Sequence, residues 1–240
     1  MGLKESGLRG SLRNVSVGIN AIPDSVGNRY TGVDAGVSDG QTPDPWPDIV
    51  GDIDLDLTSG SPTLNTESLN GVDAIDTRNT DAFYEYSNNV PNSGIEEPCT
   101  ILMAINIDSI SSDETLWRDE VGNVHELRES DGQWRLRIDG DDNTGGSAEA
   151  GDTIISLAVD SESGDLRVNG SDVTSASVDS GQTILSDTDD SGFFGAIGLS
   201  RFVEVLAGEI VIHPDKKLSG SELTDEEERL EQEYNMDVLQ

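Results

Sequence analysis

Short apolar runs of strand length, separated by turn residues and not by helices, constrain the fold of this chain most. Cys99–Ile107 is almost continuously apolar, which predicts a strand buried on both faces. Trp134–Ile138 alternates apolar and basic residues, which predicts a strand with one exposed face. Further runs of this length are 152–159, 164–169, 193–199 and 203–212. Strands spaced in this way predict an all-β sandwich or barrel.

The C-terminal end has a helical pattern instead. Residues 218–234 are acidic, and three of their apolar side chains recur at helical spacing and predict an inward stripe. These three are Leu223, Leu230 and Tyr234. Thr224 followed by Glu227 fits a capping box, and Ser221 is an earlier candidate for the N-cap. We therefore expect a short amphipathic helix.

The charge of the chain is extreme, with 48 acidic residues against 14 basic ones and a formal net charge of −34. Self-repulsion of this size opposes a compact state. Salt screens it, because the Debye length falls to ~3 Å at about 1 M. We therefore expect a protein of an extreme halophile or of its virus. In such a chain, a solvated surface is the ordinary explanation for an acidic cluster.

The first 22 residues depart from this charge. They hold three basic residues against Glu5 alone, a local net charge of +2. A basic segment on an acidic body is typical of an arm that docks on an acidic partner. The predicted docking residues are Lys4, Leu8, Arg9, Leu12 and Arg13. A disordered start that carries three basic residues by chance is the alternative.

Two stretches carry a family resemblance. In Gly208–Ser219, a Gly-Glu-apolar strand is followed by a Leu-Ser turn that leads into the acidic helix. Upstream, Trp46–Gly51 is followed by the Leu69–Gly71 turn. Both resemble segments of LamG-like domains, in the concanavalin A-like lectin and glucanase superfamily. Ile22–Ser25 also resembles the start of such domains in virion proteins of haloarchaeal tailed viruses.

The resemblance implies a concanavalin A-like jelly-roll β-sandwich over residues 23–218, behind an N-terminal docking arm over 1–22. A C-terminal helix over 219–240 would pack on the sandwich. The implied function is that of a structural virion protein, in a capsid turret, a capsid decoration or a tail fibre. Its partners would be other virion proteins of the capsid or tail scaffold, and the family implies a host-surface glycan as ligand.

The implied location is the virion, assembled in the host cytoplasm and exposed to a high-salt exterior. Repeated copies of weak sites give avidity, so we also expect a homo-oligomer. A cellular surface lectin and a halophilic carbohydrate-active enzyme are the alternatives to the virion protein.

Flat aromatic rings can stack on the apolar faces of sugars, and the chain offers four candidates for this role. They are Trp117, Trp134, Tyr84 and Tyr86. Aromatic residues make up only 5% of the chain, so a place in the hydrophobic core is the alternative for each of them.

Acidic loops are the candidates for a Ca²⁺ site, because this ion takes carboxylate and carbonyl oxygens. Asp187, Asp189 and Asp190 are the better candidates, and Asp139–Asn143 is the second. Neither loop fits the twelve-residue calcium loop, and a solvated acidic loop is the alternative for both. No other cofactor is expected.

No catalytic residues are predicted, and we expect that the chain is not an enzyme. Asp52, Asp54 and Asp56 stand at alternate positions, on one face if they share a strand. Glucanases of the superfamily place carboxyl groups about 5–5.5 Å apart, a geometry that the shorter aspartate changes. His125 and His213 have no Gly-x-Ser-x-Gly elbow to accompany them.

Other classes of protein are also excluded. The longest apolar run is far short of the ~18 residues that a membrane span needs, so no membrane insertion is expected. A Walker loop and a basic patch are absent, so no nucleic-acid partner is expected. Cys99 is the one cysteine, which excludes an intrachain disulfide.

Overall fold

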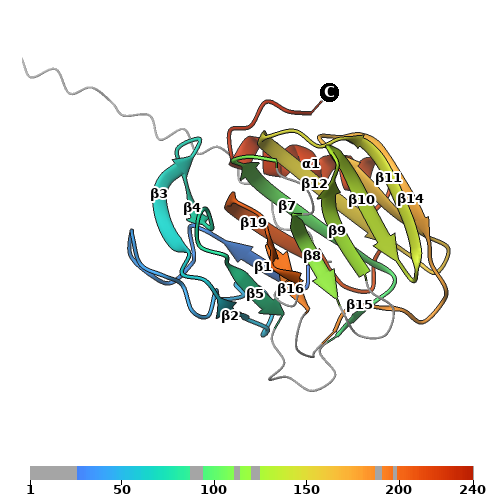
Figure 1. The fold of residues 1–240 in the computed structure, drawn as a ribbon, viewed down its shortest axis with the longest axis horizontal. Coiled ribbons are helices and arrows are strands. Elements are labelled where there is room, and N and C mark those ends of the chain that lie inside the picture. Colours follow the sequence, from blue (N-terminus) through green and yellow to red (C-terminus); the bar gives the residue numbers. More distant parts are fainter. Residues whose placement is uncertain are drawn as a thin grey trace, which may run out of the picture.

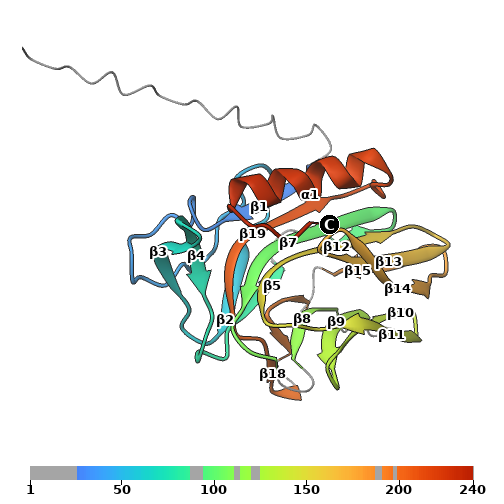
Figure 2. The ribbon, with the colours of Figure 1, turned by 90° about the horizontal axis from the view of Figure 1, so that it is seen from above.

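The fold was analysed in a computed structural model, which describes residues 26–86, 94–110, 114–119, 125–186, 191–196 and 199–239. Two antiparallel sheets pack face to face, and one helix covers the outer face of the first sheet (Figures 1 and 2). The predicted all-β sandwich with a short C-terminal helix is therefore confirmed. Over the described residues, no helix has the length and apolar character needed to cross a membrane.

The first sheet, sheet A, contains eight strands. Seven of them follow the order β14-β13-β12-β7-β19-β4-β3, and β1 pairs with β19. Their bounds are β1 (Asn28–Thr31), β3 (Thr63–Leu69), β4 (Val72–Asp76), β7 (Cys99–Ile107), β12 (Gly151–Val159), β13 (Ser163–Val168), β14 (Ser171–Ser177) and β19 (Val205–His213). The apolar runs at 152–159 and 164–169 form the antiparallel pair β12–β13.

The second sheet, sheet B, has seven strands in the order β11-β10-β9-β8-β16-β5-β2. Their bounds are β2 (Leu55–Ser59), β5 (Phe83–Tyr86), β8 (Thr115–Asp119), β9 (His125–Ser130), β10 (Gln133–Ile138), β11 (Asp141–Ser147) and β16 (Gly192–Phe193). Two short pairs complete the described strands. They are β6 (Ile95–Glu96) with β15 (Thr183–Leu185), and β17 (Gly195–Ala196) with β18 (Arg201–Phe202).

Strand β7 lies in the middle of sheet A, and its burial explains why its sequence is a continuous apolar run. Its side chains alternate between the core that separates the two sheets and a second core under the helix. Met103 and Ile105 belong to the first core, and Leu102 and Ala104 belong to the second. Both faces exclude water, so the predicted burial on both faces is confirmed.

The helix α1 (Ser221–Glu233) lies across sheet A and contacts β7 and β12 (Figure 2). The predicted inward stripe is confirmed, because Leu223, Leu230 and Tyr234 are all buried. The predicted capping box is wrong, since the N-cap is Gly220 and no side chain caps it. Gly220 has a positive φ of 55°, which glycine adopts readily, and the helix therefore begins before Thr224.

Candidate functional site

A polar cavity of about 650 Å³ is the strongest candidate for a functional site. It lies where the β3–β4 turn, the β11–β12 connection and the β13–β14 turn come together. The lining residues on which the argument depends are Asn70, Asn106, Trp134, Glu149, Asp152 and Asn169. Most of them carry a side-chain hydrogen-bonding group, so the cavity presents a polar wall to a ligand.

Two tight turns hold this wall in place. Asn70-Gly71 and Asn169-Gly170 are two-residue hairpin loops in which all four residues have positive φ, between 51° and 87°. This is the geometry of a type I′ turn, for which Asn-Gly is strongly preferred. The side-chain oxygen of Asn169 also accepts the backbone N–H of Ile154 at 2.8 Å. The two turns thus give the cavity a preformed backbone.

The carboxylate of Asp152 is the centre of the polar wall. Its Oδ1 accepts a hydrogen bond from Nδ2 of Asn106, and its Oδ2 accepts one from Nδ2 of Asn70, each at 2.7 Å. A carboxylate offers about four lone-pair positions, so roughly half of its capacity is left. Within the described residues, the side-chain oxygens of the two asparagines accept no hydrogen bond. The cluster is therefore ordered and only partly saturated.

Trp134 forms the deep wall of the cavity. It lies in β10, and its side chain is 1% exposed. Its indole N–H has no hydrogen-bond acceptor among the described residues. Gly145 lies opposite it in β11, where a Cβ would overlap the carbonyl oxygen of Val173. A buried donor without an acceptor costs about 1–3 kcal/mol, so a ligand oxygen that reached this N–H would be favoured.

The cavity is acidic. Glu149, Asp152 and Asp172 contribute carboxylates to its lining, and the described lining residues include no lysine or arginine. The lining therefore offers carboxylate acceptors together with hydroxyl and amide groups that can donate, besides the buried indole N–H. That combination suits a ligand with several hydroxyl groups, because each hydroxyl can both donate and accept.

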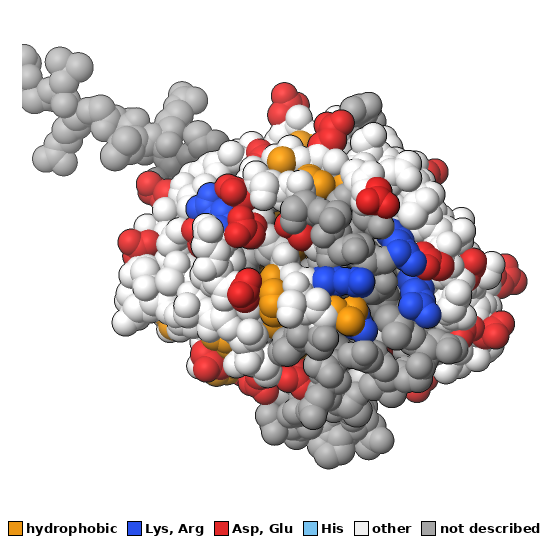
Figure 3. Space-filling model, in the orientation of Figure 1, with side chains coloured by type: hydrophobic (Ala, Val, Ile, Leu, Met, Phe, Trp, Pro, Cys, Tyr) orange, Lys and Arg blue, Asp and Glu red, His pale blue; other side chains and the backbone are white. Residues whose placement is uncertain are grey.

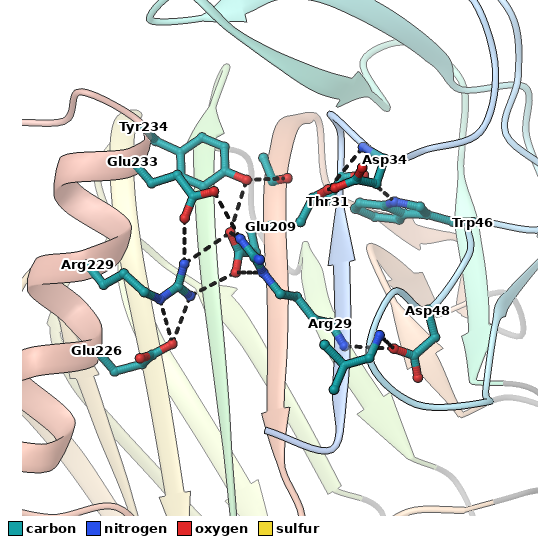
Figure 4. Close-up of polar contacts among 12 residues, drawn as sticks. Arg29, Thr31, Asp34, Trp46, Asp48, Glu209, Glu226, Arg229, Glu233 and Tyr234 are labelled. Carbon is teal, nitrogen blue, oxygen red and sulfur yellow. Dashed lines mark hydrogen bonds and ion pairs between the residues drawn. The ribbon is translucent and has the colours of Figure 1, made fainter. Parts of the chain in front are cut away.

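A second polar cluster lies between α1 and sheet A, and it is fully buried at its centre (Figure 4). Oε1 of Glu209 in β19 accepts hydrogen bonds from Arg29 Nε at 2.7 Å and from Arg229 Nη2 at 2.8 Å. The hydroxyl of Tyr234 donates to its Oε2 at 3.1 Å. Glu226 bonds Arg229 as well. Because the Glu209 carboxylate is fully buried and paired with arginines from β1 and α1, we assign this cluster to holding the helix in place.

The pKa shifts in this cluster agree with its role in holding the helix. Burial alone would raise the pKa of Glu209, but the hydrogen bonds and charges of Arg29 and Arg229 outweigh it and leave that pKa below the ordinary value. Burial alone would lower the pKa of Arg229, but the charges and hydrogen bonds of Glu209 and Glu226 outweigh it and raise that pKa. Glu209 and Arg229 therefore both stay charged near neutral pH.

The Gly-Glu pattern noted in the sequence has its structural reason here. A register shift between Ala207 and Glu209 leaves Gly208 as the extra residue of β19. The ring of Tyr234 packs where a Cβ of Gly208 would be, and the Tyr234 hydroxyl donates to the Gly208 carbonyl at 2.9 Å. The pattern thus serves the attachment of the helix.

Basic side chains gather on the outer face of sheet B, on the side of the molecule that Figure 3 shows. Arg135 and Arg137 alternate there with inward residues of β10. Asp142 of β11 lies opposite Arg137 in register and accepts a hydrogen bond from Arg135 Nε at 2.6 Å. Opposite charges across neighbouring strands stabilise a sheet, which is the role we assign to this ladder.

All four aromatic candidates belong to the main core and present no ring face to a sugar. Trp117 is 1% exposed, and Tyr84 and Tyr86 are fully buried. Tyr84 packs edge-on against Trp46, with ring centroids 5.5 Å apart. We therefore reassign all four rings from sugar stacking to the core. Trp134 is also buried, but it is the one candidate of the four that lines the cavity.

The two acidic loops predicted as Ca²⁺ candidates differ in what the structure shows of them. Asp139 starts a two-residue Asp-Gly turn with positive φ, and Asp141 accepts the backbone N–H of Ser177 at 2.7 Å, so this loop is a hairpin that uses its carboxylates internally. In the part of the chain that the structure describes, no group of three His, Cys, Asp or Glu side chains could hold a metal ion. The other Ca²⁺ candidates, Asp187, Asp189 and Asp190, lie outside the described residues.

The remaining predictions fall on several segments. Asp52 and Asp54 precede β2 and only Asp56 lies in it, so the three carboxylates do not share a strand face. His213 is buried at the end of β19. The docking residues Lys4, Leu8, Arg9, Leu12 and Arg13 lie outside the described residues, as does the side chain of His125.

No family model and no curated protein sequence matches this chain. Solved structures do match. Trypanosoma rangeli sialidase in complex with the inhibitor DANA has a TM-score of 0.58 and 15% identity, over 88% of this chain and 34% of the sialidase. The chain thus spans about a third of the length of that sialidase.

Two further matches are smaller proteins or fragments. Domain 4 of the Geobacillus stearothermophilus arabinanase AbnA, in complex with arabinotriose, has a TM-score of 0.53 and 13% identity, over 83% of this chain and 97% of that domain. The binding domain of botulinum neurotoxin serotype D/C has a TM-score of 0.55 and 11% identity, over 86% of this chain and 52% of the neurotoxin chain. At such identities the likeness shows the fold.

These matches overturn one prediction. We expected that the chain is not an enzyme, and that expectation is wrong, because the matched structures come in part from enzymes, namely sialidases and an arabinanase. The composition had suggested that the carboxylates serve only solvation. The LamG-like resemblance, the virion setting and the homo-oligomer are not tested by these matches and stay predictions.

Proposed function

We propose that this chain is a carbohydrate-binding β-sandwich and that its polar cavity holds the sugar. The observation that carries the proposal is the partly saturated cluster of Asp152, Asn70 and Asn106, in a cavity whose lining also includes Trp134 with its unpartnered indole N–H. The fold supports it, because the matched structures include an arabinanase domain with arabinotriose and a sialidase with sialic acid.

The cavity would bind a sugar through its own preformed groups. The free lone pairs of Asp152 accept hydrogen bonds from sugar hydroxyl groups, and the side-chain oxygens of Asn70 and Asn106 accept further ones. Trp134 donates its indole proton to a sugar oxygen. Because the two Asn-Gly turns already hold these groups, little further ordering is needed on binding, which favours affinity.

The finer prediction, a virion protein that displays this sandwich to host-surface glycans, rests on the sequence resemblance alone. It is compatible with the same cavity, since a repeated weak sugar site gains avidity on a particle.

The proposal is tested by isothermal titration of the chain with arabinotriose and a panel of other oligosaccharides. Asp152→Ala removes the central acceptor and the partner of both asparagines, so we expect binding to weaken about tenfold or more, equivalent to about 1.4 kcal/mol. Asp179→Ala is the matched control, because this exposed aspartate lies outside the cavity lining. If no oligosaccharide binds, or if both variants bind like the original chain, the proposal is wrong.

A further inference from the structure

We infer that the cavity selects uncharged sugars and rejects sugars that carry a carboxylate. This inference rests on the proposed function and names its ligand class. The matched structures hold ligands of both kinds, since arabinotriose is neutral and sialic acid is an acid, so the fold alone does not decide between them.

The first argument is the charge of the lining. Glu149, Asp152 and Asp172 all contribute to it, and no described lining residue is basic. Both partners of Asp152 are neutral amides, so its negative charge is not compensated by a cation in the hydrogen bonds that it makes. A carboxylate on the ligand would therefore meet uncompensated like charge at Asp152.

The second argument is the balance of donors and acceptors. At the centre of the wall, the free positions of Asp152 and of the Asn70 and Asn106 oxygens are all acceptors, while the Trp134 indole, the serine hydroxyls and the asparagine NH2 groups of the lining can donate. A ligand group that meets Asp152 must therefore donate the hydrogen bond. Hydroxyl groups donate, and an ionised carboxylate only accepts.

The third argument concerns Arg167, the basic side chain that pairs with Asp172 of the lining. Arg167 lies beside the cavity rim but is already bound, to Asp172 at 3.3 Å and to the buried Glu227 at 3.2 Å. Turning it toward an anionic ligand would leave the 1% exposed Glu227 side chain without this cation. The structure thus commits this guanidinium to Glu227 and Asp172, and Asp152 is left with neutral hydrogen-bond partners.

The test uses pairs of oligosaccharides that differ in one group, a hydroxymethyl in one and a carboxylate in the other. Titrations are made at about 1 M NaCl, where the Debye length is ~3 Å and the repulsion of the whole acidic chain is screened. A preference that persists under these conditions comes from contacts in the cavity. We expect the neutral sugar of each pair to bind at least about tenfold more tightly.

The variant Glu149→Gln sharpens the test, because Glu149 is exposed and its replacement is safe for the fold. We expect it to raise the affinity for the acidic sugar, relative to that for its neutral counterpart, about threefold, as loss of one exposed like charge would. The control Glu162→Gln changes an exposed acid outside the lining and should alter neither affinity.

The outcomes separate the inference from the proposed function. If the acidic sugar binds as well as its neutral counterpart, or if binding of either requires added Ca²⁺ and disappears with a chelator, the inference is wrong while the sugar site stands. If neither sugar of any pair binds, the proposed function itself fails.

Discussion

Two carboxylates, Glu209 under the helix and Asp152 in the cavity, show how this acidic chain divides its polar groups. Glu209 is fully buried and is held by two arginines and a tyrosine. Asp152 is half-buried and is held by two neutral amides. The first cluster neutralises its charge internally, while the second keeps its charge and part of its hydrogen-bonding capacity for a ligand.

The difference follows from desolvation. A carboxylate that is fully removed from water needs cations close by, because its loss of hydration is costly. A carboxylate at the mouth of a cavity keeps some water and can be oriented by amides alone. Saturated clusters therefore mark the attachment of elements, and partly saturated clusters at a cavity mark a candidate binding site.

The sharpest way to break this comparison is to neutralise Glu209. Glu209→Gln leaves Arg29 and Arg229 buried without their shared acid, so we expect the free energy of unfolding to fall by about 3–5 kcal/mol. Urea denaturation monitored by circular dichroism measures it. Glu228→Gln, on the exposed side of α1, should change stability by less than about 0.5 kcal/mol. Equal effects of the two variants would contradict the role given to Glu209.

Acid should weaken the helix cluster in a defined direction. The pKa of Glu209 lies below its ordinary 4.5 in the folded chain, so the unfolded chain takes up the proton more readily. Its contribution to stability is therefore complete above pH 4.5 and is lost as the pH falls through the lower folded value. The stability difference between the original chain and Glu209→Gln should shrink on acidification. A difference that stays constant down to pH 3 argues against the shift.

The smallest expected effect on stability is at the cavity. Asp152→Ala breaks two hydrogen bonds between half-exposed or exposed groups, so we expect the free energy of unfolding to change by less than about 1 kcal/mol while sugar binding weakens about tenfold or more. The same denaturation experiment measures this. A loss as large as that of Glu209→Gln would mean that Asp152 is a structural residue and would remove the contrast between the clusters.

The sequence allowed the layers of the fold to be predicted, because period and run length report burial directly. The apolar run of β7 and the spacing of Leu223 and Leu230 are local patterns of this kind. The cavity was missed, since Asn70 and Asp152 are 82 positions apart and no local pattern shows that their loops meet. The two turns at the cavity could have been predicted, because Asn70-Gly71 and Asn169-Gly170 are the dipeptides that type I′ hairpin turns favour.

The cluster under α1 also decides how the molecule responds to its solvent. Dissolved ions screen charges that face water, so an exposed pair such as Lys216–Glu222, 2.9 Å apart, weakens as salt is added. They do not reach Glu209, whose side chain is 0% exposed. The attachment of the helix is therefore nearly independent of ionic strength. A change in salt concentration alters the interactions of the acidic surface and leaves the cluster under α1 nearly unchanged.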